Sequence, residues 1–114
     1  MYEQTILETF DLLHSLGVTA NHRGYFYAAY AVSLVKEQPE RLLLVTKWLY
    51  PDIAKQYKTT WQCVERNIRT VIALAWERKP EVLATLAGFP LEKKPCVGEF
   101  LGILICGLAG KKAA

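Results

Sequence analysis

Four polar residues recur between positions 61 and 78 at spacings that place them on one side of a helix. Glu65 and Arg66 lie three and four positions after Gln62, and Arg69 lies four and three positions after them; residues so separated are neighbours on a helix surface. Arginine can donate two hydrogen bonds to guanine O6 and N7, glutamate can accept one from cytosine N4, and glutamine can contact adenine or a phosphate. The pattern favours contact with base edges in the major groove of DNA.

An ordinary solvated helix face would carry the same residue types. In that interpretation Glu65 and Arg69 form an i,i+4 ion pair worth about 0.2–0.5 kcal/mol. Glu65 could also hold a neighbouring arginine in position for a base. The residues that precede the helix favour base contact, because they have the pattern of a DNA-binding motif.

That motif is the helix-turn-helix. It needs a small residue where its helices cross, a short turn, a capping hydroxyl and a branched apolar residue four positions beyond the cap. Ala54, Thr60 and Val64 meet these needs, whereas Lys58 occupies the turn position that commonly holds glycine. We expect the motif over about residues 51–78, with its second helix as the recognition helix.

Basic and hydroxyl side chains around the motif are candidates for phosphate contacts. Residues 41–79 carry eight Lys or Arg against three Asp or Glu, although the whole chain has a net charge of only +3. Phosphate contacts set register and affinity but do not read sequence. Ordinary surface charge remains the alternative for each lysine. The candidates are Lys47, Lys55, Lys58, Thr59, Thr60 and Thr70.

The elements that position these residues are predicted to be helices throughout. Helical periodicity continues along the chain, and no sustained alternation indicates a strand. Thr5 and Glu8 fit a capping box, and Gly17 and Gly88 fit helix ends. We expect an all-α, compact domain of six or seven helices, spanning about 5–16, 21–37, 39–49, 52–57, 61–78, 80–88 and 98–108.

Apolar positions within these helices predict the core. The recognition helix should turn inward the stripe Val64, Ile68, Val71 or Ile72, Ala75 and Trp76. Aromatic side chains are expected to pack in the core and between helices rather than to stack on bases. These are Tyr25, Tyr27, Tyr30, Trp48, Tyr50 and Trp76.

Length and composition exclude several classes of protein. A chain of 114 residues has room for one core, so we expect one domain over 1–114. With 52% hydrophobic and 22% charged residues it is not a disordered tail. Residues 1–16 carry Glu3, Glu8 and Asp11 and no basic start, so we do not expect them to be a signal peptide. The longest apolar stretch, 100–110, is about half the ~20 residues of a bilayer span.

The residues with reactive side chains do not predict an enzyme. Cys63, Cys96 and Cys106 are odd in number and lack zinc-site spacing, so neither a disulfide framework nor a metal site is expected, and a cytoplasmic location is the simpler one. His14 and His22 have no partner arrangement for catalysis, and Cys63 has no adjacent general base. We expect no catalytic residue and no cofactor.

Taken together, the motifs resemble those of the C-terminal DNA-binding effector domain of stage zero sporulation protein A, a response regulator family that controls entry into endospore formation. The most specific parts are the run Tyr50-Pro51-Asp52-Ile53-Ala54-Lys55 and the run Val64-Glu65-Arg66-x-Ile68-Arg69. The similarity covers most of the chain, with further matches at Gly17-Val18, Gly24-Tyr25, Thr59-Thr60, Ala75-Trp76 and Glu99-Phe100.

This resemblance implies an all-helical fold, binding to double-stranded DNA through the major groove, and control of transcription. It implies that Glu65, Arg66 and Arg69 face bases and that Lys55 is the basic residue of the preceding helix. It also implies two copies paired or in tandem on DNA and a contact with the sigma subunit of RNA polymerase. Whether the regulator activates or represses is left open.

The chain departs from the family pattern in several places. Trp61, Gln62 and Cys63 replace smaller or basic residues, and Thr70 stands where relatives have histidine, so the operator sequence is left open. Family members also carry an N-terminal receiver domain, for which 114 residues leave no space. We therefore expect either an excised domain or a stand-alone effector.

A second class of function is suggested by the apolar segment 100–109. A helical protein-interaction module, or an antagonist that pairs with a full-length relative, could use it as a partner surface. Small residues would allow close helix approach there, although burial in the domain's own core competes with this interpretation. They are Gly102, Cys106, Gly107 and Gly110.

Overall fold

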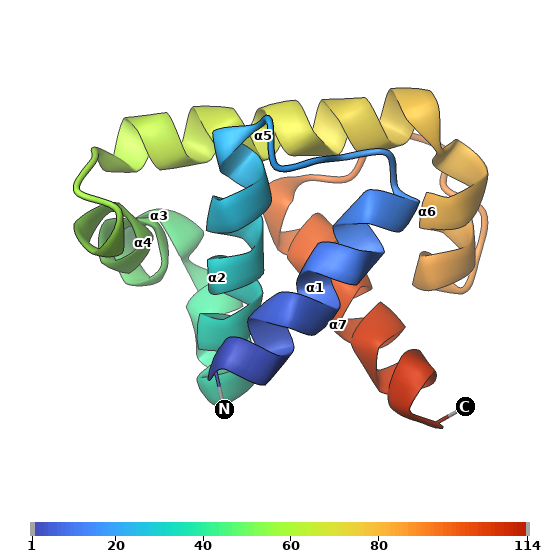
Figure 1. Ribbon diagram of the computed structural model, residues 1–114, viewed down its shortest axis with the longest axis horizontal. Coiled ribbons are helices and arrows are strands. Elements are labelled where there is room, and N and C mark those ends of the chain that lie inside the picture. Colours follow the sequence, from blue (N-terminus) through green and yellow to red (C-terminus); the bar gives the residue numbers. More distant parts are fainter. Residues whose placement is uncertain (1, 114) are drawn as a thin grey trace.

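Helices account for all the regular structure of residues 2–113, which are the residues that the computed structural model describes (Figure 1). The predicted all-α fold is confirmed. This part of the chain forms seven α-helices and one 3₁₀ helix. Their bounds are α1 (Tyr2–Ser15), α2 (Arg23–Glu37), η1 (Pro39–Leu43), α3 (Val45–Trp48), α4 (Tyr50–Gln56), α5 (Trp61–Arg78), α6 (Pro80–Ala87) and α7 (Val97–Ala113).

Two local predictions about helix starts and lengths were wrong. Because α1 already begins at Tyr2, Thr5 lies inside the helix, where its carbonyl accepts a hydrogen bond from Thr9 Oγ1 at 2.7 Å, and no capping box forms. The helix expected over 39–49 is divided at Leu44 into η1 and α3. Leu44 has a non-helical backbone, with φ −154° and ψ 77°, which separates the two helices.

Glycine ends α1 and α6 as predicted, because both helices stop at a left-handed residue. Gly17 has φ +84°, and the following Val18 donates its backbone N–H to Leu13 O at 2.9 Å. That six-to-one bond is the signature of a Schellman motif. Gly88 has φ +87° at the end of α6.

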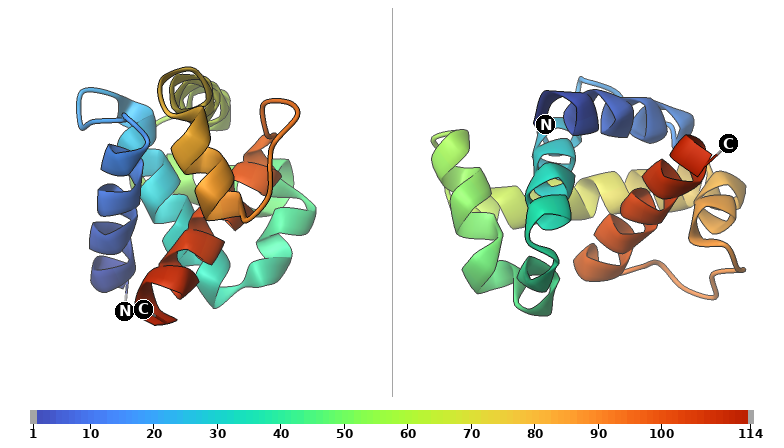
Figure 2. Two further views of the ribbon diagram at one scale, coloured as in Figure 1. Left: turned by 90° about the vertical axis from the view of Figure 1, so that its right-hand side faces the viewer. Right: turned by 90° about the horizontal axis from the view of Figure 1, so that it is seen from below.

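The long helix α5 forms one edge of the molecule, and the other helices gather on a single side of it (Figures 1 and 2). α2 runs away from α5 at a steep angle, with α1 packed beside it and α7 crossing behind. The inward stripe of α5 is buried as predicted, and Trp76 is half-buried. Its buried members are Val64, Ile68, Val71, Ile72 and Ala75.

Aromatic side chains fill several of the spaces between helices. Tyr25, Tyr27 and Tyr50 are buried, as expected. Phe10 of α1 stacks on Tyr25 of α2, with ring centroids 4.4 Å apart. Trp48 is 43% exposed, contrary to expectation, because the short α3 packs on the core through the half-buried Val45 and has no fully buried residue.

The far end of α5 is tied to the segment after α1. Arg78 Nη1 donates to the carbonyl of Gly17 at 2.8 Å, across a sequence separation of 61 residues. Since α2 contacts α5 near its middle, at Asn67 and Val71, this hydrogen bond fixes the helix at a second point. The orientation of α5 is therefore set by two contacts with the α1–α2 unit.

The contact between α2 and α5 depends on the absence of a side chain at Gly24. A Cβ atom built there would lie 2.2 Å from the Asn67 carbonyl oxygen and 2.5 Å from Val71 Cγ2. Separations below 3.0 Å require a shift, and here the neighbour is backbone that cannot rotate away. Gly24 therefore sets the distance between the two helices.

Replacing this glycine tests the helix contact. We expect Gly24→Ala to lower the free energy of unfolding by about 3 kcal/mol, because α5 must move away from α2. The matched control is Gly102→Ala in α7, where an added Cβ meets nothing within 4 Å. That change should raise the free energy of unfolding by about 0.5–1 kcal/mol through helix propensity. Denaturant titration measures both, and equal effects would contradict this account.

Among residues 2–113, no helix combines the length and the apolar character that crossing a bilayer requires.

Candidate nucleic-acid interface

Helices α4 and α5 form the two arms of the predicted helix-turn-helix, joined by a tight turn. Ala54 is buried where α4 packs on the rest of the domain, and Val64 of α5 is fully buried. After α4, Thr59 donates its backbone N–H to Ala54 O at 2.9 Å, and Lys58 donates to Lys55 O. These are the two hydrogen bonds of a Schellman motif, which turns the chain directly toward the start of α5.

Lys58 occupies the left-handed position of this turn. Its φ of +53° lies in a region that glycine adopts readily and that costs other L-residues about 1–2 kcal/mol. The sequence pattern identified this as the glycine position of the motif, and the structure gives the reason. The chain therefore keeps a charged side chain at a strained position beside the start of α5.

The N-terminal end of α5 is capped by Thr60. The residue has an extended backbone, and its Oγ1 accepts a hydrogen bond from the Cys63 N–H at 3.2 Å. Such a cap stabilises a helix by about 1 kcal/mol. It fixes the residue at which α5 begins, and hence the direction in which the next side chains point.

The four predicted base-contact residues lie on the first two and a half turns of α5, outside the core. Gln62 and Arg66 are exposed, and the Arg69 side chain is 69% exposed. Glu65 is more covered, at 31%, and its Oε2 accepts from Arg69 Nη2 at 3.4 Å. An ion pair this long and this exposed adds little stability. It holds Arg69 loosely, so the guanidinium can be drawn toward another acceptor.

Tyr50 lies beneath this pair, at the start of α4. Its side chain is buried, and burial raises the pKa of Tyr50 to about 12, with a further contribution from the neighbouring carboxylate of Glu65. The Arg69 charge acts in the opposite direction. The hydroxyl of Tyr50 is thus within electrostatic range of both members of the Glu65–Arg69 pair.

The predicted phosphate-contact residues fall into two groups. Lys55, Lys58, Thr59 and Thr60 gather around the turn, next to the start of α5; all are exposed except Thr59, which is half-buried. Two others lie apart from them. Thr70 is farther along α5, where its hydroxyl donates to Arg66 O at 3.1 Å, and Lys47 is on α3 in a hollow with Arg41 and Asp52.

Arg23 is a basic residue of this surface that sequence reasoning missed. It is the exposed first residue of α2, and it lines a hollow of about 360 Å³ with Lys58, Thr59 and Tyr57. It stands 35 positions before Lys58 in the sequence. No spacing rule links residues so far apart, because only the packing of α2 on α5 brings them together.

Cys63 lies in the first turn of α5, half-buried between polar groups. Hydrogen bonding to the Thr59 side chain lowers the pKa of the Cys63 thiol, and Arg66 contributes to the same shift. Asn67 Nδ2 donates to its sulfur at 3.3 Å. All three cysteines are free thiols, and the described residues contain no group of His, Cys, Asp and Glu arranged to hold a metal ion.

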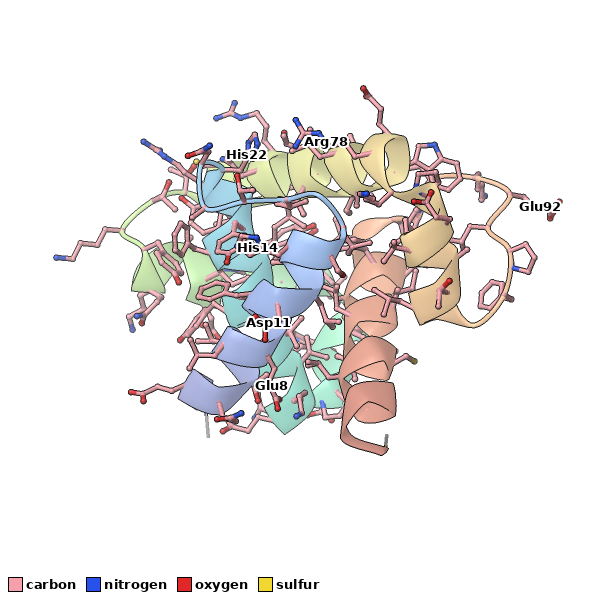
Figure 3. All side chains as sticks on the ribbon, turned by 45° about the vertical axis from the view of Figure 1, so that its right-hand side comes forward. Glu8, Asp11, His14, His22, Arg78 and Glu92 are labelled. Atoms are coloured by element: carbon pink, nitrogen blue, oxygen red, sulfur yellow. The ribbon has the colours of Figure 1, made fainter. Side chains whose placement is uncertain are left out.

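The two histidines lie away from this surface or at its margin. Figure 3 shows His14 on α1 and His22 just before α2. The exposed His14 ring meets the edge of Tyr25, with centroids 5.6 Å apart. His14 thus has the packing role expected for a helix-surface residue.

The apolar helix α7 contributes mainly to the core. Phe100, Leu101 and Leu104 are fully buried. Gly107 is buried against Leu12 and Leu86, whereas Cys106 and Gly110 are exposed. Most apolar residues of α7 are therefore buried within the domain itself, as in the interpretation that competes with a partner surface.

An all-α domain with a capped helix-turn-helix and exposed arginines at the start of its second helix belongs to the class of DNA-binding regulators. Comparison with known protein families makes this specific. The family model described as "Sporulation initiation factor Spo0A C terminal" matches residues 9–108. The chain belongs to this family, and the predicted resemblance is confirmed. It is a DNA-binding effector domain of a sporulation regulator. The members of this family are transcription regulators, and the family is not known as one of enzymes.

Substitutions at Lys58 test the strained turn. Lys58→Gly should raise the free energy of unfolding by about 1 kcal/mol, because glycine adopts a positive φ without a clash. Lys58→Ala is the matched control, since it removes the same charge but keeps a Cβ, and should leave stability nearly unchanged. Denaturant titration distinguishes the two, and a glycine variant less stable than the parent protein would refute the explanation.

Alkaline unfolding tests the burial of Tyr50. A pKa raised from 10.0 to about 12 means that this group stabilises the fold fully below pH 10 and loses its contribution as the pH rises from 10 to 12. The free energy of unfolding of Tyr50→Phe should therefore fall less steeply over that range than that of the parent protein. Parallel slopes in denaturant titrations at several pH values would show that Tyr50 does not titrate as described.

Proposed function

We propose that this domain is a sequence-specific regulator of transcription that reads double-stranded DNA with α5 in the major groove. The observation that carries the proposal is the position of Gln62, Arg66 and Arg69. They project from the capped N-terminal half of α5, the end that a recognition helix presents to base edges. The opposite stripe of the same helix is buried, so this face is directed outward.

Each residue of this face has a role that its chemistry supports. Arg66 and Arg69 can each donate two hydrogen bonds to guanine, a contact worth about 1–3 kcal/mol of discrimination. Glu65 keeps Arg69 near the base edges through the 3.4 Å contact, or accepts from cytosine. Gln62, nearest the helix start, contacts adenine or a phosphate.

Residues around the turn supply the phosphate contacts in this proposal. Lys55 and Lys58 are exposed, and Thr59 and Thr60 lie between them and the first turn of α5. They bind one strand of the backbone and set the register of α5. Lys47 and Thr70 are weaker candidates, because Lys47 lies on α3 and the Thr70 hydroxyl is bonded to Arg66 O.

Other parts of the proposal rest on the family alone. In these parts, residues 1–114 act as one effector domain in the cytoplasm. Two copies bind DNA as a pair or in tandem, and the domain contacts the sigma subunit of RNA polymerase. The alternative, a protein-interaction module that uses α7, has less support, because Leu101 and Leu104 of that helix lie in the core.

Arginine substitutions test the proposed readout. Preferred sites are first selected from a random duplex pool, and affinities for a selected and a scrambled duplex are then measured by anisotropy. Arg66→Ala and Arg69→Ala should each reduce the discrimination between them by about 1–3 kcal/mol. Lys55→Ala should weaken both duplexes equally and reduce the salt slope by about 0.9, as expected for one phosphate contact.

Arg66→Lys is the charge-matched control. Lysine keeps the positive charge but lacks the planar pair of donors, so this variant should retain general affinity and lose preference. If no duplex is selected by the parent protein, or if both alanine variants keep its full discrimination, α5 does not read bases.

A further inference from the structure

The connection between α6 and α7 lies beside the far edge of the proposed base-contact face. Residues 88–96 return from α6 to the start of α7 (Figure 2). They form with α5 a hollow of about 310 Å³, whose lining includes Arg69 and Ile72 from α5 and Lys93 and Lys94 from the connection. Both lysines are exposed. A residue proposed to contact bases thus shares a surface with two cations that lie outside the helix-turn-helix.

The charge of this hollow is positive. The carboxylate among its described lining residues is Glu99, whose Oε1 accepts a hydrogen bond from the Cys96 N–H at 2.9 Å. That bond lowers the pKa of Glu99, and the nearby Lys93 charge contributes. Arg69, Lys93 and Lys94 still outnumber the carboxylates when Glu65, the ion-pair partner of Arg69, is added to Glu99, so an anion is the ligand that the hollow favours.

The hollow lies on a different flank of α5 from the turn residues. α2 covers one flank, where Gly24 meets the backbone of Asn67. On that flank Arg23 and Lys58 line the hollow of about 360 Å³ described above. Arg69 and Ile72 mark the other flank. A helix in the major groove has a phosphate strand on each side of it, because the groove is bounded by both backbones.

We propose that Lys93 and Lys94 bind phosphates of the DNA strand that borders the groove on this second flank, with Arg69 placed between them and the base edges. This inference rests on the proposed binding of α5 in the major groove. The connection then acts as a second backbone contact, opposite the one made by Lys55 and Lys58. Contacts on both strands fix the rotation of α5 in the groove, and so determine which base Arg69 reaches.

The double variant Lys93→Ala/Lys94→Ala tests this site. Its affinity for the selected and the scrambled duplex should fall by the same factor, and its salt slope should decrease by about 1.8, at about 0.9 per phosphate contact. Thermal unfolding should be unchanged, because both side chains are exposed. Lys36→Ala is the control: this lysine is at the end of α2 away from α5, and its removal should leave the salt slope unchanged.

Ethylation interference locates the contact. Ethylating phosphates on both strands should weaken binding of the parent protein, and the double variant should become insensitive to ethylation on one strand only. If the parent protein binds DNA but the double variant has the same salt slope and the same ethylation pattern, the inference is overturned and the proposed function is left intact. The inference is equally overturned if the lysines bind inorganic phosphate but do not affect DNA binding. Failure of the parent protein to bind any duplex overturns the proposed function itself.

Discussion

The crossing of α2 and α5 at Gly24 determines which side of α5 faces outward. With no side chain at Gly24, the backbone of α2 approaches the Asn67 carbonyl more closely than any Cβ would allow. This contact presses the stripe that includes Val64 and Ile68 into the core, where both are fully buried. Because a helix has one rotation about its axis, burying that stripe leaves Arg66 and Arg69 on the solvent side.

The turn before α5 shows a balance between stability and charge. Lys58 adopts a left-handed conformation that glycine would adopt at lower free energy. Strained backbone is common where a side chain has a function that the strain-free residue cannot supply. A positive charge at the start of the proposed recognition helix is such a function, and glycine has no charge to offer there.

The positive charge of the proposed interface comes from separate parts of the chain. The net charge of +3 does not indicate it, because acidic residues elsewhere compensate. Arg23 from α2, Lys58 from the turn and Lys93 from the α6–α7 connection line hollows on two flanks of α5. In the proposed complex, cations on two flanks of α5 face both strands that border the groove, whereas a single basic run could follow only one strand.

The sequence by itself determined the helices and the motif, because their signals are local. Periodicity predicted α5 and its buried stripe, Thr60 predicted its start, and Gly17 and Gly88 predicted two ends. The division at Leu44 and the exposure of Trp48 were missed, since the helical signals over 39–49 do not show where the backbone leaves the helix or which side chains stay outside the core. Only the tertiary structure brought Arg23 and Lys93 beside α5. Helix packing joins residues far apart in the chain, and no spacing along one sequence encodes that proximity.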